Sequence, residues 1–582
     1  MAEQVDVLIA GSGFGGAITA YRLAELYHAA GADAGGVLVL DKGPRRKNTD
    51  FKQSMHIEHL SDVYELIQGT GAQIVVARGV GGGSALYLAA SLRAPTETFE
   101  RRDRRPGDGD ERRMWPGAIS RASLNPYYRR AELGLRVNRP SWNQVSKSGG
   151  LWAANLRAAG HTCDRVPVAI SPRRCVNVKW CHTGCVFGAK NSLYTNYLPS
   201  AERLGVKIRP HAQVEQVRQV SNRPYRYSVT VSSIDPASRQ PAGRYEIQCK
   251  VLVLSTGAMG NSPILMRSRT DLPSLSEQLG RHLGVNGDHV AAIEYDPKRV
   301  REVLGLPGFA DFHKGKPITT MTYDYWVGRR SNAFDGTRFN LQEIFLSSLT
   351  NFLYDDGRDP GGDPSWWGLQ KKDAIANWAS RIELLAMVED TNDGDFYSVP
   401  PTGGGAIRPN AGPVAVGLFN YVLSEQSRRV RESADAAMKR IGEHRGLGRF
   451  MKLTETQGSY ASHPLGGCRM AEDASLGVTD HTGAVFGYEG LYCIDSSIIP
   501  TSLGVNPSLT IAAVSERCAE TLALRGGDFG LPAVPPGFRH GRPDVILGER
   551  RTSPLEPGRL RTRRRRRRRR PRRRRARGRA RR

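Results

Sequence analysis

Residues 5–16 read Val-Asp-Val-Leu-Ile-Ala-Gly-Ser-Gly-Phe-Gly-Gly, and this stretch decides the fold class. Its first half is a short apolar run typical of a buried strand, and glycines follow it at once. Residues 17–26 then repeat apolar side chains at helical spacing, and residues 37–40, Val-Leu-Val-Leu, predict a second strand. The order strand, glycine turn, helix, strand predicts a βαβ unit and therefore an α/β fold containing a parallel sheet.

The glycine turn has the spacing G-x-G-x-x-G, with Gly11, Gly13 and Gly16. Glycines at these positions permit the tight turn and let the backbone approach a pyrophosphate, which the helix N-terminus then stabilises. Asp41 closes the second strand 25 positions after Gly16, where a carboxylate can accept hydrogen bonds from the ribose of an adenine dinucleotide. A plain glycine-rich turn, with Asp41 as a helix or turn cap, is the alternative.

Two further segments carry glycine motifs. Residues 250–255 form another apolar strand that runs into Thr-Gly-Ala-Met-Gly, as expected where a parallel sheet delivers residues to a ligand. Residues 77–84 hold four glycines beside an apolar strand, which suits either backbone wrapped around a planar cofactor or a flexible loop. Because these segments are far apart in the chain, we expect the sheet to be assembled from discontinuous pieces.

Two polar motifs lie near the C-terminus. Residues 462–469 read Ser-His-Pro-Leu-Gly-Gly-Cys-Arg, and residues 495–507 begin Asp-Ser-Ser and end Gly-Val-Asn-Pro. Pro507 suits the first position of a helix, so we expect Asn506 to cap a helix over residues 508–517. The N-terminus of that helix would favour nearby negative charge, although an ordinary capped helix is the alternative.

Residues 11–16, 77–84, 462–469 and 495–507 are four motifs that, in this order, resemble those of the glucose-methanol-choline (GMC) oxidoreductase family. The resemblance covers residues 5–95, 175–290 and 455–525. Within the family, His-Pro-Leu-Gly-Gly-Cys followed by Ser-Leu-Gly-Val-Asn-Pro is most similar to the cholesterol oxidase-like branch. The resemblance implies FAD as cofactor, bound by a Rossmann-like domain of the p-hydroxybenzoate hydroxylase type. It also implies an antiparallel sheet that lies over the flavin and forms the substrate site.

The resemblance assigns roles to individual residues. His463 matches the catalytic histidine, which can accept or orient the hydroxyl proton while a hydride leaves carbon for the flavin N5. Asn506 matches its partner and would hold the same oxygen as a donor, whereas a buried structural role is the alternative for His463. The positions that match FAD contacts are Gly11, Gly13, Phe14, Gly16, Asp41, Gly83, Val214, Gly257, Asp495 and Asn506.

Departures from the family pattern leave other roles open. Tyr87 stands where the family often has Asn, which puts the oxygen or flavin contact made there in doubt. Family members that also isomerise the steroid double bond use a glutamate over the sterol, and here only Glu383 and Glu389 are candidates.

The cysteine content argues against a metal centre. Cys175, Cys181, His182 and Cys185 cluster in eleven residues, which raises the alternatives of zinc and iron–sulfur. Their spacing fits no usual ligand set, so we expect no bound metal.

Eight cysteines in 582 residues are sparse, and the N-terminus lacks the pattern of a signal peptide. Because no run of 18 apolar residues occurs either, we expect a cytoplasmic protein without a spanning helix.

The net charge of +27 belongs to one end of the chain. Residues 559–582 contain 18 arginines and no acid, and only +9 remains on the rest of the sequence. A proline-rich stretch precedes them, and such a composition cannot bury enough apolar surface to order itself. We therefore expect residues 535–582 to be a disordered tail, whose arginines could bind nucleic acid without sequence preference.

Together these observations predict the fold class and the domains. The βαβ unit that binds FAD is α/β, and the chain as a whole is α+β. An FAD-binding domain comprises residues 1–95, 195–290 and 455–530, and a substrate-binding domain comprises residues 96–194 and 291–454. We expect oxidation of a secondary alcohol, a sterol 3-hydroxyl, with O2 as electron acceptor and a hydrophobic sterol-like alcohol as partner. Peripheral membrane contact stays open. The alternatives are a dehydrogenase of another bulky alcohol with a different acceptor, or nucleic-acid binding through the tail.

Overall fold

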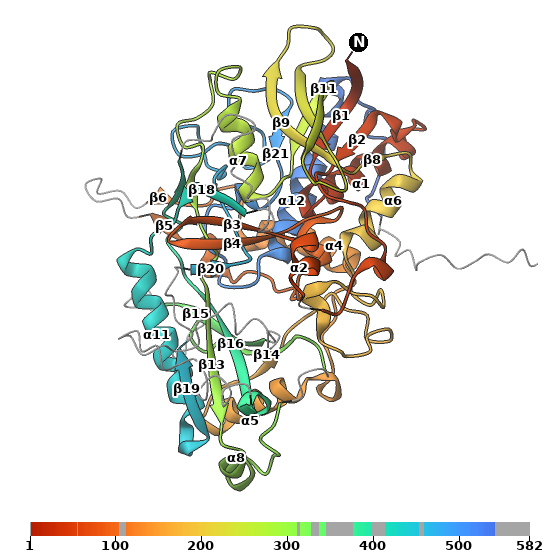
Figure 1. Cartoon of the computed structure of the whole chain (residues 1–582). Coiled ribbons are helices and arrows are strands. Elements are labelled where there is room, and N and C mark those ends of the chain that lie inside the picture. The colour runs from red at the N-terminus through yellow and green to blue at the C-terminus, as the bar shows by residue number, and fades with distance from the viewer. Residues whose placement is uncertain are drawn as a thin grey trace, which may run out of the picture.

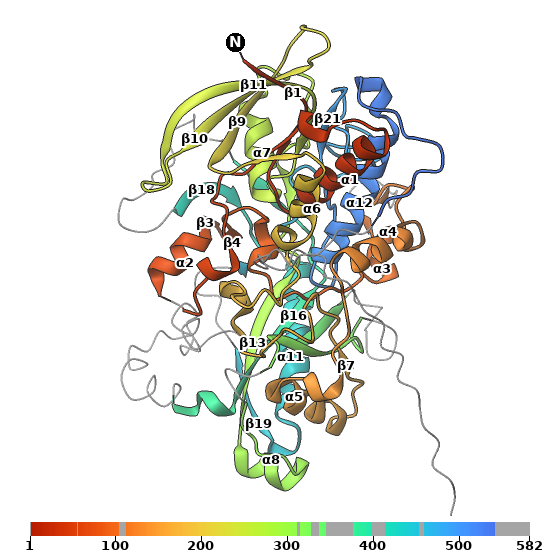
Figure 2. The ribbon, with the colours of Figure 1, turned by 90° about the vertical axis from the view of Figure 1, so that its right-hand side faces the viewer.

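The structure is a computed structural model that describes residues 2–54, 56–103, 112–310, 315–326, 337–344, 376–397, 414–452 and 459–541. Three sheets follow one another along the molecule. Figure 1 shows the first sheet at the top, the third at the bottom and the second between them, and the turned view in Figure 2 agrees.

The first sheet contains the predicted βαβ unit. Among the described residues it has seven strands, in the order β8-β2-β1-β11-β10-β9, with β21 beside β11. Strand β1 pairs in parallel with β2 and β11, whereas β9 and β10 run antiparallel to their neighbours. The strands are β1 (Glu3–Ala10), β2 (Val37–Leu40), β8 (Lys207–Arg209), β9 (Ala212–Gln219), β10 (Tyr227–Ile234), β11 (Pro241–Leu254) and β21 (Leu491–Cys493). The prediction of a sheet assembled from distant segments is confirmed.

Helices cover this sheet and extend its core. They are α1 (Phe14–Ala29), α4 (Arg121–Gly134), α6 (Tyr197–Arg203), α7 (Ala258–Arg267) and α12 (Ser508–Leu524). Helix α12 packs against both α1 and α4. Leu124 and Tyr128 of α4 belong to the same buried cluster as the first sheet, although α4 lies inside the predicted substrate-binding domain. The expected boundary at residue 96 therefore does not follow the packing.

The second sheet takes strands from both expected domains. Its order is β12-β17-β18-β3-β4-β20. The strands are β3 (Tyr64–Thr70), β4 (Ala72–Ala77), β12 (Arg281–Leu283), β17 (Gly394–Phe396), β18 (Val414–Asn420) and β20 (Ser459–Ala461). Because β20 pairs with β4 and leads directly into residues 462–469, this sheet fixes where that motif begins.

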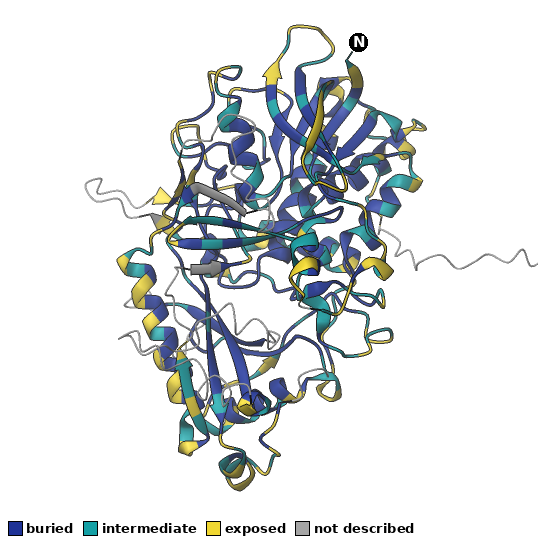
Figure 3. Ribbon diagram, viewed as in Figure 1, coloured by how far each residue is buried: buried dark blue, intermediate teal, exposed yellow. Residues whose placement is uncertain are grey.

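The third sheet is antiparallel at every described pair, in the order β19-β13-β16-β15-β14-β7. The strands are β7 (Asp164–Arg165), β13 (Asp288–Tyr295), β14 (Ile318–Thr322), β15 (Phe339–Ile344), β16 (Arg381–Val388) and β19 (Gly448–Lys452). Helices α5 (Lys147–Ala158) and α11 (Glu425–Gly442) pack on one face of it. Figure 3 shows α11 buried on one side and exposed on the other. The predicted antiparallel sheet is confirmed.

Short elements complete the described chain. They are α2 (Ile57–Val63), α3 (Thr96–Phe99), α8 (Pro297–Leu304), β5 (Arg102–Asp103) and β6 (Arg112–Arg113). No helix in the described part of the chain has both the length and the apolar character that crossing a bilayer requires.

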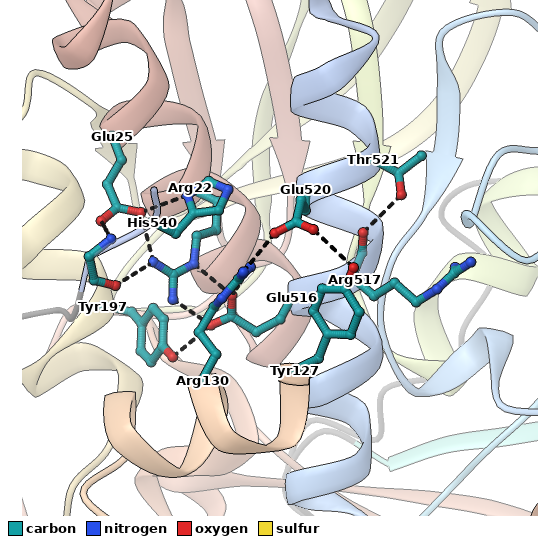
Figure 4. A network of polar contacts seen from close by, with 11 residues as sticks. Arg22, Glu25, Tyr127, Arg130, Tyr197, Glu516, Arg517, Glu520, Thr521 and His540 are labelled. Carbon is teal, nitrogen blue, oxygen red and sulfur yellow. Dashed lines mark hydrogen bonds and ion pairs between the residues drawn. The ribbon is translucent and has the colours of Figure 1, made fainter. Parts of the chain in front are cut away.

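A buried ion network joins α1 to α12 (Figure 4). Arg22 donates two hydrogen bonds to Glu516, from Nε to Oε2 at 2.6 Å and from Nη2 to Oε1 at 2.7 Å, and both side chains are fully buried. The Tyr197 hydroxyl donates to Glu516 at 2.9 Å, and Arg130 reaches Glu520 one turn further along α12 at 2.7 Å. The network therefore fixes the two helices relative to each other.

The same network anchors the proline-rich segment after α12. Arg22 donates to the carbonyl of Gly541 at 2.8 Å, and the Gly541 amide donates to Glu25 at 2.7 Å. The His540 ring also contacts Glu25, at 3.0 Å. The expected tail boundary at residue 535 was therefore placed too early, because backbone groups of this segment find charged partners on α1. Residues 542–582, which include the arginine-rich run, lie outside the described residues.

Candidate active site

Three glycine turns border open space at the carboxyl end of the first sheet. A side chain at Gly13, Gly83 or Gly257 would meet no atom within 4 Å. A side chain at Gly82 would instead lie 2.9 Å from the Cα of Gly13, so the second glycine loop packs on the first. Helix α1 begins directly after Gly13 and α7 directly after Gly257, and helix N-termini favour anions.

Other glycines of the first loop serve close packing. Gly11 has a φ of +91°, and a side chain there would approach the carbonyl oxygen of Ser255 to 2.2 Å. A side chain at Gly16 would lie 1.9 Å from the carbonyl oxygen of Gly11. These two glycines let the loop fold tightly, whereas Gly13 alone of the motif's three glycines borders the open space.

Asp41 lies at the end of β2 and is buried against the glycine loops. Its carboxylate accepts hydrogen bonds from the Ser12 hydroxyl and from the Gly43 amide, the latter at 2.8 Å. The Ser12 Oγ also accepts from the Gly81 amide at 2.9 Å, so Ser12 joins both glycine loops to the acid. Burial raises the pKa of the Asp41 carboxyl. We did not predict this role of Ser12. Its only signal in the sequence is its position between Gly11 and Gly13 of the G-x-G motif.

Strand β9 begins beside Asp41. The Ala212 amide donates to the Asp41 carbonyl at 2.9 Å, and Val214 follows two residues later as a buried residue of the same core. The structure therefore brings Val214 to the same end of the sheet as Asp41.

Asp495 follows β21 and is held by three donors. Its Oδ2 accepts from the Gly257 amide at 2.6 Å and from the Asn261 side chain at 3.0 Å, and its Oδ1 accepts from the Ser497 amide at 2.8 Å. Burial raises the pKa of this carboxyl as well. Asp495 thus fixes the start of α7 next to Gly257, through Asn261, a residue that we did not predict.

Phe14 and Tyr87 lie edge to face beside the glycine loops, with ring centroids 5.8 Å apart. The Tyr87 hydroxyl donates to the Asn191 carbonyl at 3.1 Å. Tyr87 therefore does not offer this hydroxyl in place of the Asn that the family often has there.

His463 is oriented by a carboxylate. Its Nδ1 lies 2.7 Å from Oδ1 of Asp288, the first residue of β13, and 22% of the His463 side chain is exposed. The Ser462 amide donates to the other oxygen of Asp288 at 3.2 Å. Because an ionised carboxylate only accepts, Nδ1 carries the ring proton and Nε2 is left as an acceptor. The ring can therefore take a proton from a hydroxyl placed at Nε2.

Asn506 has an unused hydrogen-bonding atom. It is 6% exposed, and its Oδ1 has no hydrogen-bond partner in the structure as described. The prediction that Asn506 caps α12 is wrong, because no side chain caps the helix and the Asn506 Oδ1 makes no hydrogen bond. The helix also runs past the expected end at residue 517, to Leu524.

Residues 284–288 hold in place the two motifs that contain His463 and Asn506. The Asn286 side chain donates to the Val505 carbonyl at 2.9 Å and accepts from the Leu503 amide at 2.7 Å, which fixes the loop before Asn506. Asp288, two residues later, orients His463. We did not predict Asn286 or Asp288, and their only signal is a pair of polar side chains just before an apolar strand.

The two glutamate candidates differ in surroundings. Glu389 pairs with Arg101 at 2.8 Å, after the end of β16. Glu383 is buried within β16 opposite Ala292 of β13, on the sheet face that carries Asp288. Of the two glutamates, Glu383 is therefore the better candidate for a residue that lies over the substrate.

Metal analysis of the purified protein should find less than about one zinc or iron per chain, because the spacing of Cys175, Cys181 and Cys185 fits no usual ligand set. Within the described ranges no three His, Cys, Asp or Glu side chains are grouped to hold a metal ion, and Cys175, Cys181 and Cys185 are free thiols. A full equivalent of metal that is lost in Cys181→Ala would contradict this expectation.

We expect the cofactor to lie in the open space beside Gly13, which gives a direct test. Gly13→Val should leave the fold stable, since a Cβ atom at this position has no protein atom within 4 Å, and should lower FAD content at least about tenfold, or ~1.4 kcal/mol. FAD per chain and the melting temperature of the apoprotein measure the two effects. Gly11→Ala is the matched control and should lower the melting temperature, because its side chain clashes with Ser255. Normal FAD content in Gly13→Val would refute the cofactor position.

Known proteins are similar to this chain over most of its length. Models of the family described as GMC oxidoreductase match residues 5–284 and 419–515. A cholesterol oxidase of Mycobacterium tuberculosis is 27% identical over 96% of this chain and 96% of its own length. A long-chain-alcohol oxidase of Arabidopsis thaliana is 23% identical, over 88% of this chain and 66% of its own. Among solved structures, an FAD-dependent oxidoreductase from Chaetomium thermophilum superposes with a TM-score of 0.58 at 15% identity, covering 89% of this chain and 99% of that one.

Proposed function

We propose that this chain, which belongs to the GMC oxidoreductase family, oxidises the secondary hydroxyl of a bulky apolar alcohol, a sterol 3-hydroxyl, and passes the electrons to O2. The family membership makes it an FAD-dependent oxidoreductase that acts on CH–OH groups. The substrate, the acceptor and the residue roles that follow are our proposals.

The cofactor residues have a consistent arrangement. We assign the pyrophosphate to the space beside Gly13 at the start of α1, the ribose to Asp41, and further contacts to Phe14, Gly83, Val214, Gly257 and Asp495. Gly11 and Gly16 act by shaping the loop. When bound, FAD accepts the hydride that leaves the alcohol carbon.

The catalytic residues divide the work at the substrate oxygen. Nε2 of His463 takes the hydroxyl proton, and Asp288 stabilises the positive charge that the ring gains. Asn506, which is 6% exposed, holds the same oxygen as a donor, through the nitrogen of its side-chain amide. Asn286 and Asp288 are positioning residues, since they act through the 503–505 loop and through His463.

The sheet face that carries Asp288 supports a bulky apolar substrate. The apolar members of its rows are Val290, Leu385, Met387, Ile344 and Met321. The polar members of the same rows are Asp288, Glu383, Asn340 and Gln342. Apolar burial of this kind is roughly proportional to the area removed from water, so a rigid hydrocarbon frame gains more there than a small alcohol. This face is the observation that carries the proposal.

Anaerobic mixing with a panel of alcohols tests the proposal. We expect a 3β-hydroxysterol to bleach the flavin absorbance faster than a long-chain primary alcohol or a short secondary alcohol at equal concentration. Admitting air should then restore the absorbance and release hydrogen peroxide. Bleaching by the long-chain alcohol alone would favour the activity named for the Arabidopsis relative, and no reoxidation by air would remove O2 as acceptor.

A further inference from the structure

Strand β15 carries two buried amides without partners. Asn340 and Gln342 are both 0% exposed, and the oxygen and nitrogen of each side chain lack a hydrogen-bond partner in the structure as described. A buried polar group without a partner costs its desolvation free energy, and for that reason buried amides are nearly always bonded. Asn286 shows the usual case, because both ends of its amide are paired. The pair on β15 therefore indicates a binding function.

The register of the sheet places these amides on the substrate face. Asn340 lies opposite Met387, which in turn lies opposite Asp288 on β13. Gln342 lies opposite Leu385, which lies opposite Val290. Residues that face one another across antiparallel strands point to the same side of the sheet. The amides therefore share a face with the carboxylate that orients His463.

Packing on the other face agrees with this assignment. Phe339 and Leu341, which alternate with the amides along β15, belong to the cluster formed with α11 and α5. Leu385 and Met387, which lie opposite the amides, belong instead to the core of the first sheet. Alternate side chains of a strand point to opposite faces, so Asn340 and Gln342 are directed toward the part of the molecule that binds the cofactor.

The geometry of the sheet gives the separation. Asn340 and Asp288 lie in one row, two strands apart, which places their Cα atoms about 10 Å from each other. Met387 lies between them and is apolar. A substrate whose hydroxyl is at His463 and whose body covers Met387 would bring its far end to Asn340 and Gln342.

We propose that Asn340 and Gln342 form a second polar subsite, which binds an oxygen at the far end of the substrate. The preferred substrate is then a rigid apolar alcohol with a second hydrogen-bonding oxygen about 10 Å from the reacting one, such as a steroid oxygenated at its far end. This inference rests on the proposed function for the reacting hydroxyl. It goes beyond that proposal, because an apolar sterol side chain would leave both amides without a partner.

A matched pair of steroids tests the subsite. 3β-Hydroxyandrost-5-en-17-one and androst-5-en-3β-ol differ only in the far carbonyl. For the parent enzyme we expect kcat/KM for flavin reduction to favour the ketone at least about tenfold, because the site rejects an analogue that leaves its polar groups unpaired. In the double variant Asn340→Leu/Gln342→Met that ratio should fall to about one. Leu341→Met, on the opposite face of the same strand, is the control and should keep the parent ratio.

Thermal stability gives a readout independent of turnover. Without steroid, the double variant should melt at or above the parent temperature, because two unpaired amides have been replaced by apolar side chains of similar size. The ketone should raise the melting temperature of the parent more than the deoxy steroid does, and should lose that advantage in the variant. A parent that treats the two steroids alike in melting temperature, or a variant that keeps the parent ratio, would overturn the subsite. If neither steroid reduces the flavin, the proposed function fails, and the melting temperatures alone decide the subsite.

Discussion

Replacing His463 with alanine should slow reduction of the bound flavin by about 100-fold to 10,000-fold, the usual contribution of a positioned general base. The reason is that Nε2 is the acceptor left once Nδ1 donates to Asp288. FAD content should not change, because His463 makes no hydrogen bond to the glycine turns at Gly13, Gly83 and Gly257 among the described residues. Rapid-mixing kinetics under anaerobic conditions measure the rate. A variant that keeps its FAD and reduces it at the parent rate would refute the assignment.

Two neighbouring variants separate proton transfer from positioning. Asn506→Leu should also slow reduction, because an oxygen without its donor is misplaced for hydride transfer. Its effect should not add to that of His463→Ala, since both residues act on one oxygen. Asp288→Asn should also slow reduction, by as much as about 10,000-fold, because it keeps the shape but allows the ring proton to move from Nδ1 to Nε2, where the ring then no longer accepts. Additive losses in the His463 and Asn506 double variant would mean separate roles.

The parts of the fold that could be predicted are those whose elements show a pattern in a short stretch of sequence. The apolar run of residues 5–10, its glycines and the strand at 37–40 predicted the βαβ unit, and the structure has it as β1, α1 and β2. The strand predicted at 250–255 exists as the end of a longer strand, β11. Periodicity detects such elements because each buries one face or one stripe against a neighbour.

The errors and omissions have two physical sources. Asn506 was misassigned because Asn suits a helix start before Pro, and only the structure shows that no side chain caps α12. Asp288 was missed because it lies 175 positions from His463, and a carboxylate before a strand carries no local sign of such a partner. Residues 535–541 were placed in the tail on composition, since a contact with Glu25 cannot be read from proline content.

The largest effect on stability is expected at the ion pair that joins α1 to α12. Arg22 of α1 and Glu516 of α12 are both fully buried, at a sequence separation of 494. Burial alone would lower the pKa of the Arg22 guanidinium, but Glu516 outweighs it and raises that pKa above its usual value. The pair is thus charged and matched. Either partner left alone would be a buried charge that has lost its main counter-charge, with Glu25 at 2.7 Å still beside Arg22 or Arg130 at 3.7 Å still beside Glu516.

Arg22→Met should therefore lower the free energy of unfolding by about 3–5 kcal/mol, the usual cost of removing one partner from a buried ion pair. Restoring balance with Arg22→Met/Glu516→Leu should recover most of the loss, because no buried charge then remains unpaired in this pair. Arg45→Met is the matched control: Arg45 pairs with Glu202 where the side chains are 43% and 29% exposed, and its loss should cost about 0–1 kcal/mol. Chemical denaturation of the three variants measures these differences. An unchanged midpoint in Arg22→Met, or a double variant weaker than the single, would show that α1 and α12 are held together by their apolar contacts and not by this ion pair.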